Sequence, residues 1–143
     1  MSHSLNKIWI HAIWATKERA KLIHPAIENQ VYDFMAKEFT EAGCKVRIIN
    51  GMPEHIHALF LLNAHKALAD IIKQIKGACS HWVNDQNFMK EKFLWQTGYA
   101  AYSVSESQIE KVHRYILNQK QHHQKMTFEN EYDDFIRLNN IAE

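Results

Sequence analysis

Residues 51–62 of the chain read Gly-Met-Pro-Glu-His-Ile-His-Ala-Leu-Phe-Leu-Leu. Gly51 and Pro53 are typical of a turn, and the apolar run that follows them has the length of a β-strand. Side chains alternate along a strand, so His55 and His57 are expected on one face. Residues two apart on a strand are separated by roughly 6.5 to 7 Å, and metal-imidazole bonds are about 2 Å long, so both histidines can converge on one ion. A pair of hydrogen-bonded histidines without an ion would give the same pattern.

A second pattern occurs near the end of the chain, where Tyr115 and Gln119 are four residues apart in a stretch with helical periodicity. Residues at this spacing lie above one another on a helix, which would stack a phenol hydroxyl and an amide oxygen. The hydroxyl is a potential nucleophile. Tyrosine and glutamine at this spacing are common in ordinary helices, so the pattern gains meaning only in combination with the two histidines.

The length of 143 residues fits one domain that spans residues 1–143, with a core over 7–104 and two helices within 105–140. We find no apolar run long enough to cross a membrane and no order of residues typical of a signal peptide, so we expect a cytoplasmic protein. Cys44 and Cys79 form no close pair, which favours reduced, packed thiols over a disulfide or a zinc site.

The periodicity of apolar residues predicts strand, helix, strand, strand, helix, strand, followed by two further helices. This order predicts an α+β fold, a ferredoxin-like antiparallel sheet (βαββαβ) with both crossover helices on one face and two extra C-terminal helices. We expect Val46 and Ile48 to share one face of their strand. The expected strands cover about 7–16, 44–50, 55–62 and 98–104, and the expected helices cover 25–42, 68–82, 105–121 and a last segment that begins at Thr127.

Three motifs carry a family resemblance: Glu54-His55-Ile56-His57 after a Gly-x-Pro turn, Trp95-Gln96-x-Gly98-Tyr99, and Tyr115-Ile116-Leu117-Asn118-Gln119. With them, nearly the whole chain resembles the small single-tyrosine HUH transposases of bacterial insertion sequences (IS200-like), where U is a hydrophobic residue.

The resemblance implies a DNA transposase, a metal-dependent enzyme that cuts and transfers single-stranded DNA at hairpin-bearing ends through a 5′-phosphotyrosine. It implies that His55, His57 and Gln119 bind a divalent metal, Mg²⁺ or Mn²⁺, and that Tyr115 is the nucleophile. Imidazole ligands by themselves suit zinc, nickel or manganese better than magnesium. His122, one helical turn past Gln119, is either a further contact to the site or a solvated histidine.

The resemblance also implies a homodimer in which the sheets join and the tyrosine helix of one subunit can complete the metal site of the other. Lysine plus arginine number 17 against 16 acidic residues, so contact with DNA must come from a local basic patch. The candidates for this patch are Lys73, Lys76, Arg114 and Lys120, with Lys111 and Arg47 as further ones.

Two alternatives stay open at this point. The first is a domesticated relative that processes palindromic elements of its host genome with the same chemistry. The second is a non-catalytic ferredoxin-like dimer that binds nucleic acid or a small ligand, for which Tyr115 would lie far from His55 and His57. A two-histidine phosphodiesterase fits poorly, because such enzymes need two separate His-x-Thr/Ser motifs.

Overall fold

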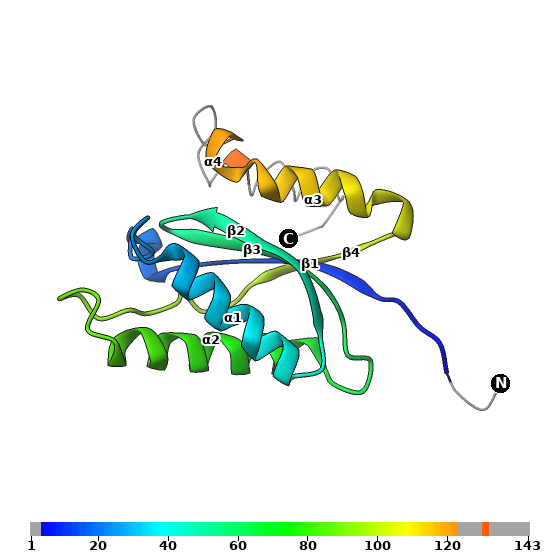
Figure 1. The fold of residues 1–143 in the computed structure, drawn as a ribbon, viewed down its shortest axis with the longest axis horizontal. Coiled ribbons are helices and arrows are strands. Elements are labelled where there is room, and N and C mark those ends of the chain that lie inside the picture. The colour runs from blue at the N-terminus through cyan, green and yellow to red at the C-terminus, as the bar shows by residue number, and fades with distance from the viewer. Residues whose placement is uncertain (1–3, 123–129, 132–143) are drawn as a thin grey trace.

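The computed structural model describes residues 4–122, 130 and 131, and its centre is a four-stranded antiparallel sheet with the order β2-β3-β1-β4. This strand order with a helix in each crossover confirms the predicted ferredoxin-like sheet (Figure 1). The strands are β1 (Trp9–Ala15), β2 (Lys45–Met52), β3 (His55–Leu61) and β4 (Ala100–Val104), and the helices are α1 (Glu28–Glu41), α2 (Leu68–Asp85), α3 (Ile109–Leu117) and α4 (Gln119–His122).

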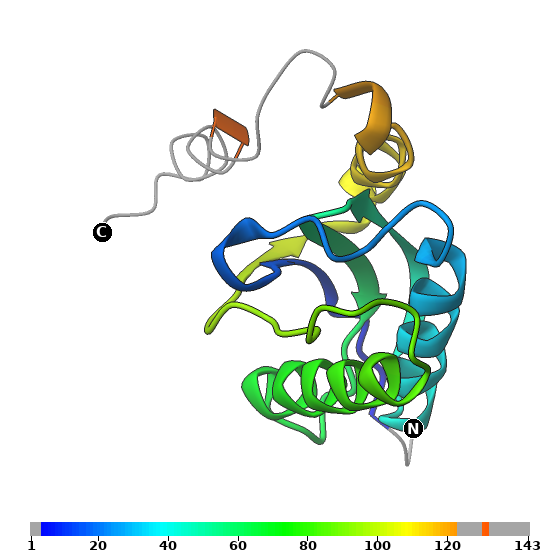
Figure 2. The ribbon, with the colours of Figure 1, turned by 90° about the vertical axis from the view of Figure 1, so that its left-hand side faces the viewer.

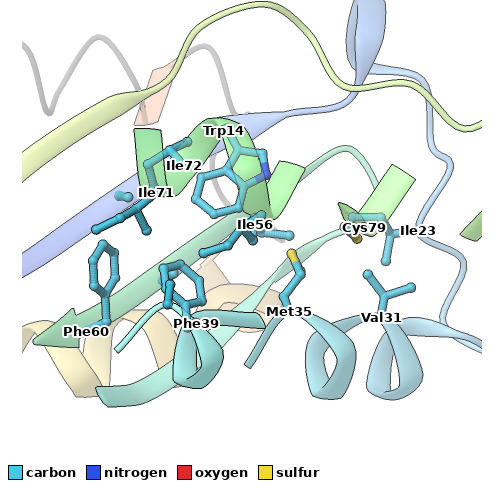
Figure 3. Packing of buried hydrophobic residues seen from close by; sticks show 14 of the residues in the cluster. Trp14, Ile23, Val31, Met35, Phe39, Ile56, Phe60, Ile71, Ile72 and Cys79 are labelled. Atoms are coloured by element: carbon cyan, nitrogen blue, oxygen red, sulfur yellow. The ribbon is translucent and has the colours of Figure 1, made fainter. Parts of the chain in front are cut away.

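Helices α1 and α2 pack together on one face of the sheet, where they form the main core. Figure 3 shows side chains of β1 and β3 facing those of the two helices in this core. Each strand contributes every second residue, as the pleat requires. The labelled members are Trp14, Ile56 and Phe60 from the sheet, Val31, Met35 and Phe39 from α1, Ile71, Ile72 and Cys79 from α2, and Ile23 from the loop before α1.

Helix α3 covers the opposite face of the sheet, and Figures 1 and 2 show it across the sheet from α1 and α2. A smaller apolar cluster holds it there, in which Leu59 of β3 packs with Ile109 and Ile116 of α3. Leu59 alternates with Ala58 and Phe60, which belong to the main core. The two histidines of β3 therefore share their face with α3, as the alternation predicts.

Strand β2 departs from the predicted alternation. Its register against β3 shifts between Val46 and Ile48, which marks a β-bulge. Val46 packs against the main core, whereas Ile48 packs against the cluster under α3. The prediction that these two residues share one face was wrong. The extra residue of the bulge shifts the alternation by one, so the side chains that follow it point to the opposite faces.

The first helix is slightly shorter than predicted, and Gly43 ends it. Residues 25–27 form a turn, so α1 begins at Glu28. Gly43 has a φ of 81°, and its N–H bonds to the carbonyl of Thr40 while the N–H of Cys44 bonds to the carbonyl of Phe39. This is a Schellman motif, which favours glycine at the left-handed position.

The predicted helix from Ser105 to about Gln121 is broken. Residues 106–108 form a 3₁₀ turn, α3 ends at Leu117, and Asn118 separates it from α4. The last helix predicted from Thr127 lies outside the described residues, except that Asn130 and Glu131 are helical.

The two cysteines are free and buried, which confirms the prediction of packed thiols. Burial raises the pKa of the Cys79 thiol to about 12. Within residues 4–122, 130 and 131, we find no helix with the length and apolar character needed to span a bilayer.

Candidate metal and nucleophile site

His55 and His57 lie on the central part of the sheet, because β3 is paired on both sides, with β1 and with β2. Both side chains are fully buried beneath the layer formed by α3 and α4. Their rings are 5.2 Å apart between centroids and stand at 71° to one another. The strand alternation therefore brings two imidazoles together on the face away from α1 and α2.

Each of these histidines uses its Nδ1 atom for a contact within the protein. His55 Nδ1 lies 3.2 Å from Oε1 of Glu54, and His57 Nδ1 lies 2.8 Å from Nε2 of His11 on β1. Metal-binding histidines have such partners on the nitrogen that does not bind the ion, because the partner fixes the tautomer and the ring orientation. The Nε2 atoms of both histidines then point toward the same space.

The side-chain amide of Gln119, on α4, lies between His55 and Glu131. Its Oε1 lies 3.2 Å from His55 Nε2, and its Nε2 donates a hydrogen bond of 3.0 Å to Oε2 of Glu131. The side chain is fully buried. Gln119 is thus beside His55, although it lies on a different helix from Tyr115.

Tyr115 of α3 lies next to His57, with 5.8 Å between the ring centroids and an edge-to-face arrangement. Its ring centroid is 6.4 Å from that of His11. The hydroxyl of Tyr115 donates a hydrogen bond to Oε2 of Glu131. The four residues predicted for the site, His55, His57, Tyr115 and Gln119, therefore lie together in a single chain.

Glu131 is a member of this group that the sequence did not indicate. Its Oε1 lies 3.1 Å from His57 Nε2 and 3.4 Å from His55 Nε2, and the residue is 1% exposed. Among the described residues, His55, His57 and Glu131 form a cluster whose ligand atoms lie within 4.8 Å of one another, close enough to hold a metal ion. Glu131 stands in a segment rich in acidic residues, where no spacing distinguishes it.

His11 is the second residue that was missed. It is 2% exposed, and burial, together with the charge of His57, lowers its pKa to about 3 against a smaller opposing effect of Glu131. The sequence did hold a signal: a single histidine stands within an apolar strand that is covered on both faces, and a polar side chain in such a place needs a partner.

Burial and two acidic neighbours act in opposite directions on the pKa of His55. Burial alone would lower the pKa of this imidazole, but hydrogen bonds with Glu131 and Glu54 outweigh burial and raise the pKa above its usual value. The folded protein therefore holds a proton on His55 more tightly than a free histidine does, with a carboxylate oxygen near each ring nitrogen. A divalent cation bound at Nε2 would replace that proton.

The basic residues predicted to contact DNA lie in two regions. Lys73 and Lys76 are on α2, across the sheet from the histidines, and Lys76 Nζ donates to the carbonyls of Gln96 and Gly98 at 2.8 Å each. Arg114 is exposed on α3 beside Tyr115. Their contact with DNA stays a prediction.

Lys120, the fourth predicted DNA contact, is tied into the hairpin of β2 and β3. Its Nζ donates to Oδ1 of Asn50 at 3.0 Å and to the carbonyl of Gly51 at 2.9 Å, and it pairs with Glu28 at 3.1 Å. These contacts hold α4 against the sheet. His122 ends α4, and its side chain lies outside the described part of the chain.

Comparisons with known proteins agree with this architecture. A family model described as "Transposase IS200 like" matches residues 4–119. The chain is similar to the ISDra2 transposase TnpA of Deinococcus radiodurans, with 27% identity over 114 residues that cover 76% of this chain and 81% of that protein.

Two solved structures resemble the fold. One is a putative transposase from Deinococcus radiodurans, with a TM-score of 0.67, 25% identity, and coverage of 83% of this chain and 95% of the other. The second is a REP-associated tyrosine transposase bound to a REP hairpin, with a TM-score of 0.61, 16% identity, and coverage of 86% and 74%. The second likeness concerns the fold alone.

Proposed function

The chain belongs to the IS200-like transposase family, a family of HUH-type nucleases, and we propose that it cuts and rejoins single-stranded DNA with Tyr115 as the nucleophile. The observation that supports this most is the meeting of Tyr115, Gln119 and the two histidines of β3 on one face of the sheet. These side chains come from three different elements.

We propose that a divalent ion, Mg²⁺ or Mn²⁺ as the resemblance implies, binds between His55, His57 and Gln119. The donor set fits an ion, because two imidazole nitrogens and an amide oxygen face one space and both imidazoles are oriented through Nδ1. When bound, the ion would polarise a phosphoryl oxygen and offset the charge that develops on the phosphate.

In this proposal the hydroxyl oxygen of Tyr115 attacks a scissile phosphate in line with the leaving 3′ oxygen. The bond to the 3′ oxygen breaks as the bond to the tyrosine oxygen forms, which gives a 5′-phosphotyrosine and a free 3′-hydroxyl. The proton lost by the phenol is balanced by the proton gained by the 3′ oxygen. The phosphodiester energy is retained, so a different 3′-hydroxyl can reverse the step and join new strands without a nucleotide cofactor.

We propose hairpin-bearing single-stranded DNA as the substrate. The REP-associated tyrosine transposase, whose fold is similar, is bound to a REP hairpin in its structure. Arg114 precedes Tyr115 on α3 and is exposed, so we propose that its guanidinium contacts DNA phosphates. We also propose the homodimer implied by the family, with a tyrosine helix that can serve its own or the partner's site.

The position of Tyr115 argues against the non-catalytic alternative, which requires this residue to lie far from the histidines. In this structure the ring of Tyr115 is 5.8 Å from that of His57 in the same chain. The phenol and the imidazoles thus lie close together within one chain.

The test is incubation with labelled single-stranded hairpin DNA and Mn²⁺, followed by a denaturing gel that detects a covalent adduct of protein and DNA. Wild type is expected to form the adduct, Tyr115→Phe is expected to form none, and the matched control Tyr99→Phe, at a 39% exposed tyrosine, is expected to form as much as wild type. An equal amount of adduct from Tyr115→Phe would disprove the role of this tyrosine.

A further inference from the structure

We propose that Glu131 is a ligand of the divalent ion, so that this chain holds the ion with a carboxylate in addition to the two histidines and Gln119. The inference rests on the proposed function, because it concerns the same ion. It adds a residue that lies twelve positions beyond Gln119, in the segment that follows the helix bearing the nucleophile.

The distances fit a shared ion. Bonds of about 2.0 to 2.2 Å from an ion to imidazole nitrogen and carboxylate oxygen place neighbouring ligand atoms roughly 3 to 3.4 Å apart. Oε1 of Glu131 lies 3.1 Å from His57 Nε2 and 3.4 Å from His55 Nε2. The carboxylate oxygen thus stands where a third ligand would stand beside the two imidazoles.

The charge of the site fits as well. His55, His57 and Gln119 are neutral ligands when an ion is bound, and they would leave both positive charges of the ion uncompensated by the protein. A buried carboxylate supplies one negative charge, and burial makes it a strong partner for a cation. A carboxylate oxygen also suits Mg²⁺ and Mn²⁺ better than imidazole does. Glu131 therefore explains how a site with two histidines can accept these ions.

The second oxygen of the same carboxylate joins the ion site to the nucleophile. Oε2 accepts hydrogen bonds from the hydroxyl of Tyr115 and from Nε2 of Gln119. Because Oε1 faces the histidines, one side chain fixes the position of the phenol relative to the ion. Loss of Glu131 would disturb both the ion and the orientation of Tyr115.

The test measures Mn²⁺ binding to the full-length, DNA-free protein by electron paramagnetic resonance of the unbound ion. We expect Glu131→Gln, which keeps the size of the side chain, to weaken Mn²⁺ binding by at least about tenfold. Glu110→Gln, at an exposed glutamate of α3, is the matched control and should bind as wild type does. Glu131→Asp keeps a carboxylate and should bind more tightly than Glu131→Gln, and circular dichroism checks that each variant is folded.

Unchanged or tighter Mn²⁺ binding by Glu131→Gln would overturn the inference, since tighter binding would mean that the carboxylate only fills the site when the ion is absent. His57→Ala separates this failure from failure of the proposed function. If Glu131→Gln binds normally while His57→Ala does not, only the role of Glu131 is wrong. If His57→Ala also binds normally, the ion site itself is wrong.

Discussion

His11 Nε2 lies 2.8 Å from His57 Nδ1, so one buried imidazole fixes the tautomer of another. An ion at His57 Nε2 requires a lone pair on that atom, which places the ring proton on Nδ1 and makes His11 Nε2 the acceptor. Only an uncharged His11 has such an acceptor. Burial and the neighbouring His57 lower the pKa of His11 to about 3, which keeps this imidazole neutral at physiological pH.

Replacement of His11 by alanine is expected to weaken Mn²⁺ binding by roughly 10- to 100-fold, because His57 would lose the partner that orients it. His11→Asn keeps an acceptor oxygen and should retain more affinity than the alanine variant. Isothermal titration calorimetry of the DNA-free protein measures both affinities. Equal Mn²⁺ affinities for wild type and His11→Ala would show that His57 is oriented by other contacts.

His11 is expected to lower the stability of the folded protein as the pH decreases below 6.5, whereas His55, whose pKa is raised, contributes in the opposite direction. The folded state holds the pKa of His11 near 3, whereas the unfolded chain has an ordinary histidine pKa of about 6.5. Between these values the unfolded state binds the additional proton, so this group lowers the free energy of unfolding by roughly 1 kcal/mol from pH 6.5 to 5.5 and by up to about 1.4 kcal/mol per pH unit at lower pH. Urea unfolding at pH 6.5 and 5.5 measures the slope.

His11→Asn provides the comparison for this pH dependence. The other titratable residues are the same in both proteins, so the difference between the two slopes reports the contribution of His11. We expect a smaller loss of stability from pH 6.5 to 5.5 in the variant. Identical slopes would mean that the folded protein protonates His11 as readily as the unfolded chain does.

The histidine pair and the sheet were predictable because both follow from short-range patterns. Strand alternation alone assigns His55 and His57 to one face, and the order of strands and helices limits the possible topologies to a few. The hairpin was predictable because an alternating strand precedes the turn at Gly51 and Pro53 and an apolar strand follows it. These features need no knowledge of distant contacts.

Other features of the site depend on contacts between distant segments, and sequence reasoning missed them. Glu131 contacts His57 although the two residues are 74 positions apart in the sequence. The residues around Glu131 contain no motif that would single it out as part of the site. The bulge between Val46 and Ile48 could not be predicted, because the adjacent Ile48 and Ile49 offer an apolar side chain to either face of the sheet. Helical spacing also runs through Asn118, although the helix ends there.

Asn50 of β2 bonds to the end of α3, at the break between α3 and α4. Its Nδ2 donates to the carbonyls of Ile116 and Leu117 at 2.9 and 3.1 Å, and its Oδ1 accepts from Lys120. These carbonyls belong to the last turn of α3, where the chain no longer supplies the regular N–H partners of a helix interior. We expect Asn50→Ala to lower the free energy of unfolding by about 1 to 3 kcal/mol and to weaken Mn²⁺ binding, because Gln119 follows directly.

Asn63→Ala is the matched control for Asn50→Ala. Asn63 Nδ2 donates to the carbonyl of Ala42 at the end of α1, on the opposite side of the sheet from the histidines. Its loss should lower stability by a similar amount and leave Mn²⁺ affinity unchanged. Urea unfolding and calorimetry measure the two effects, and equal Mn²⁺ affinities in both variants would contradict the role of Asn50.

The hairpin that carries His55 depends on the absence of a side chain at Gly51. A Cβ atom there would lie 2.2 Å from the carbonyl oxygen of His55 and 2.8 Å from Cα of Ile56, both of which are backbone atoms. The strands would have to separate, so Gly51→Ala is expected to cost about 1 to 3 kcal/mol or more and to weaken Mn²⁺ binding. At Gly77, within α2, a Cβ atom would meet nothing within 4 Å. Gly77→Ala is therefore expected to raise stability by up to about 1 kcal/mol. Urea unfolding measures both variants. A Gly51→Ala protein as stable as wild type would refute the close approach of β2 and β3.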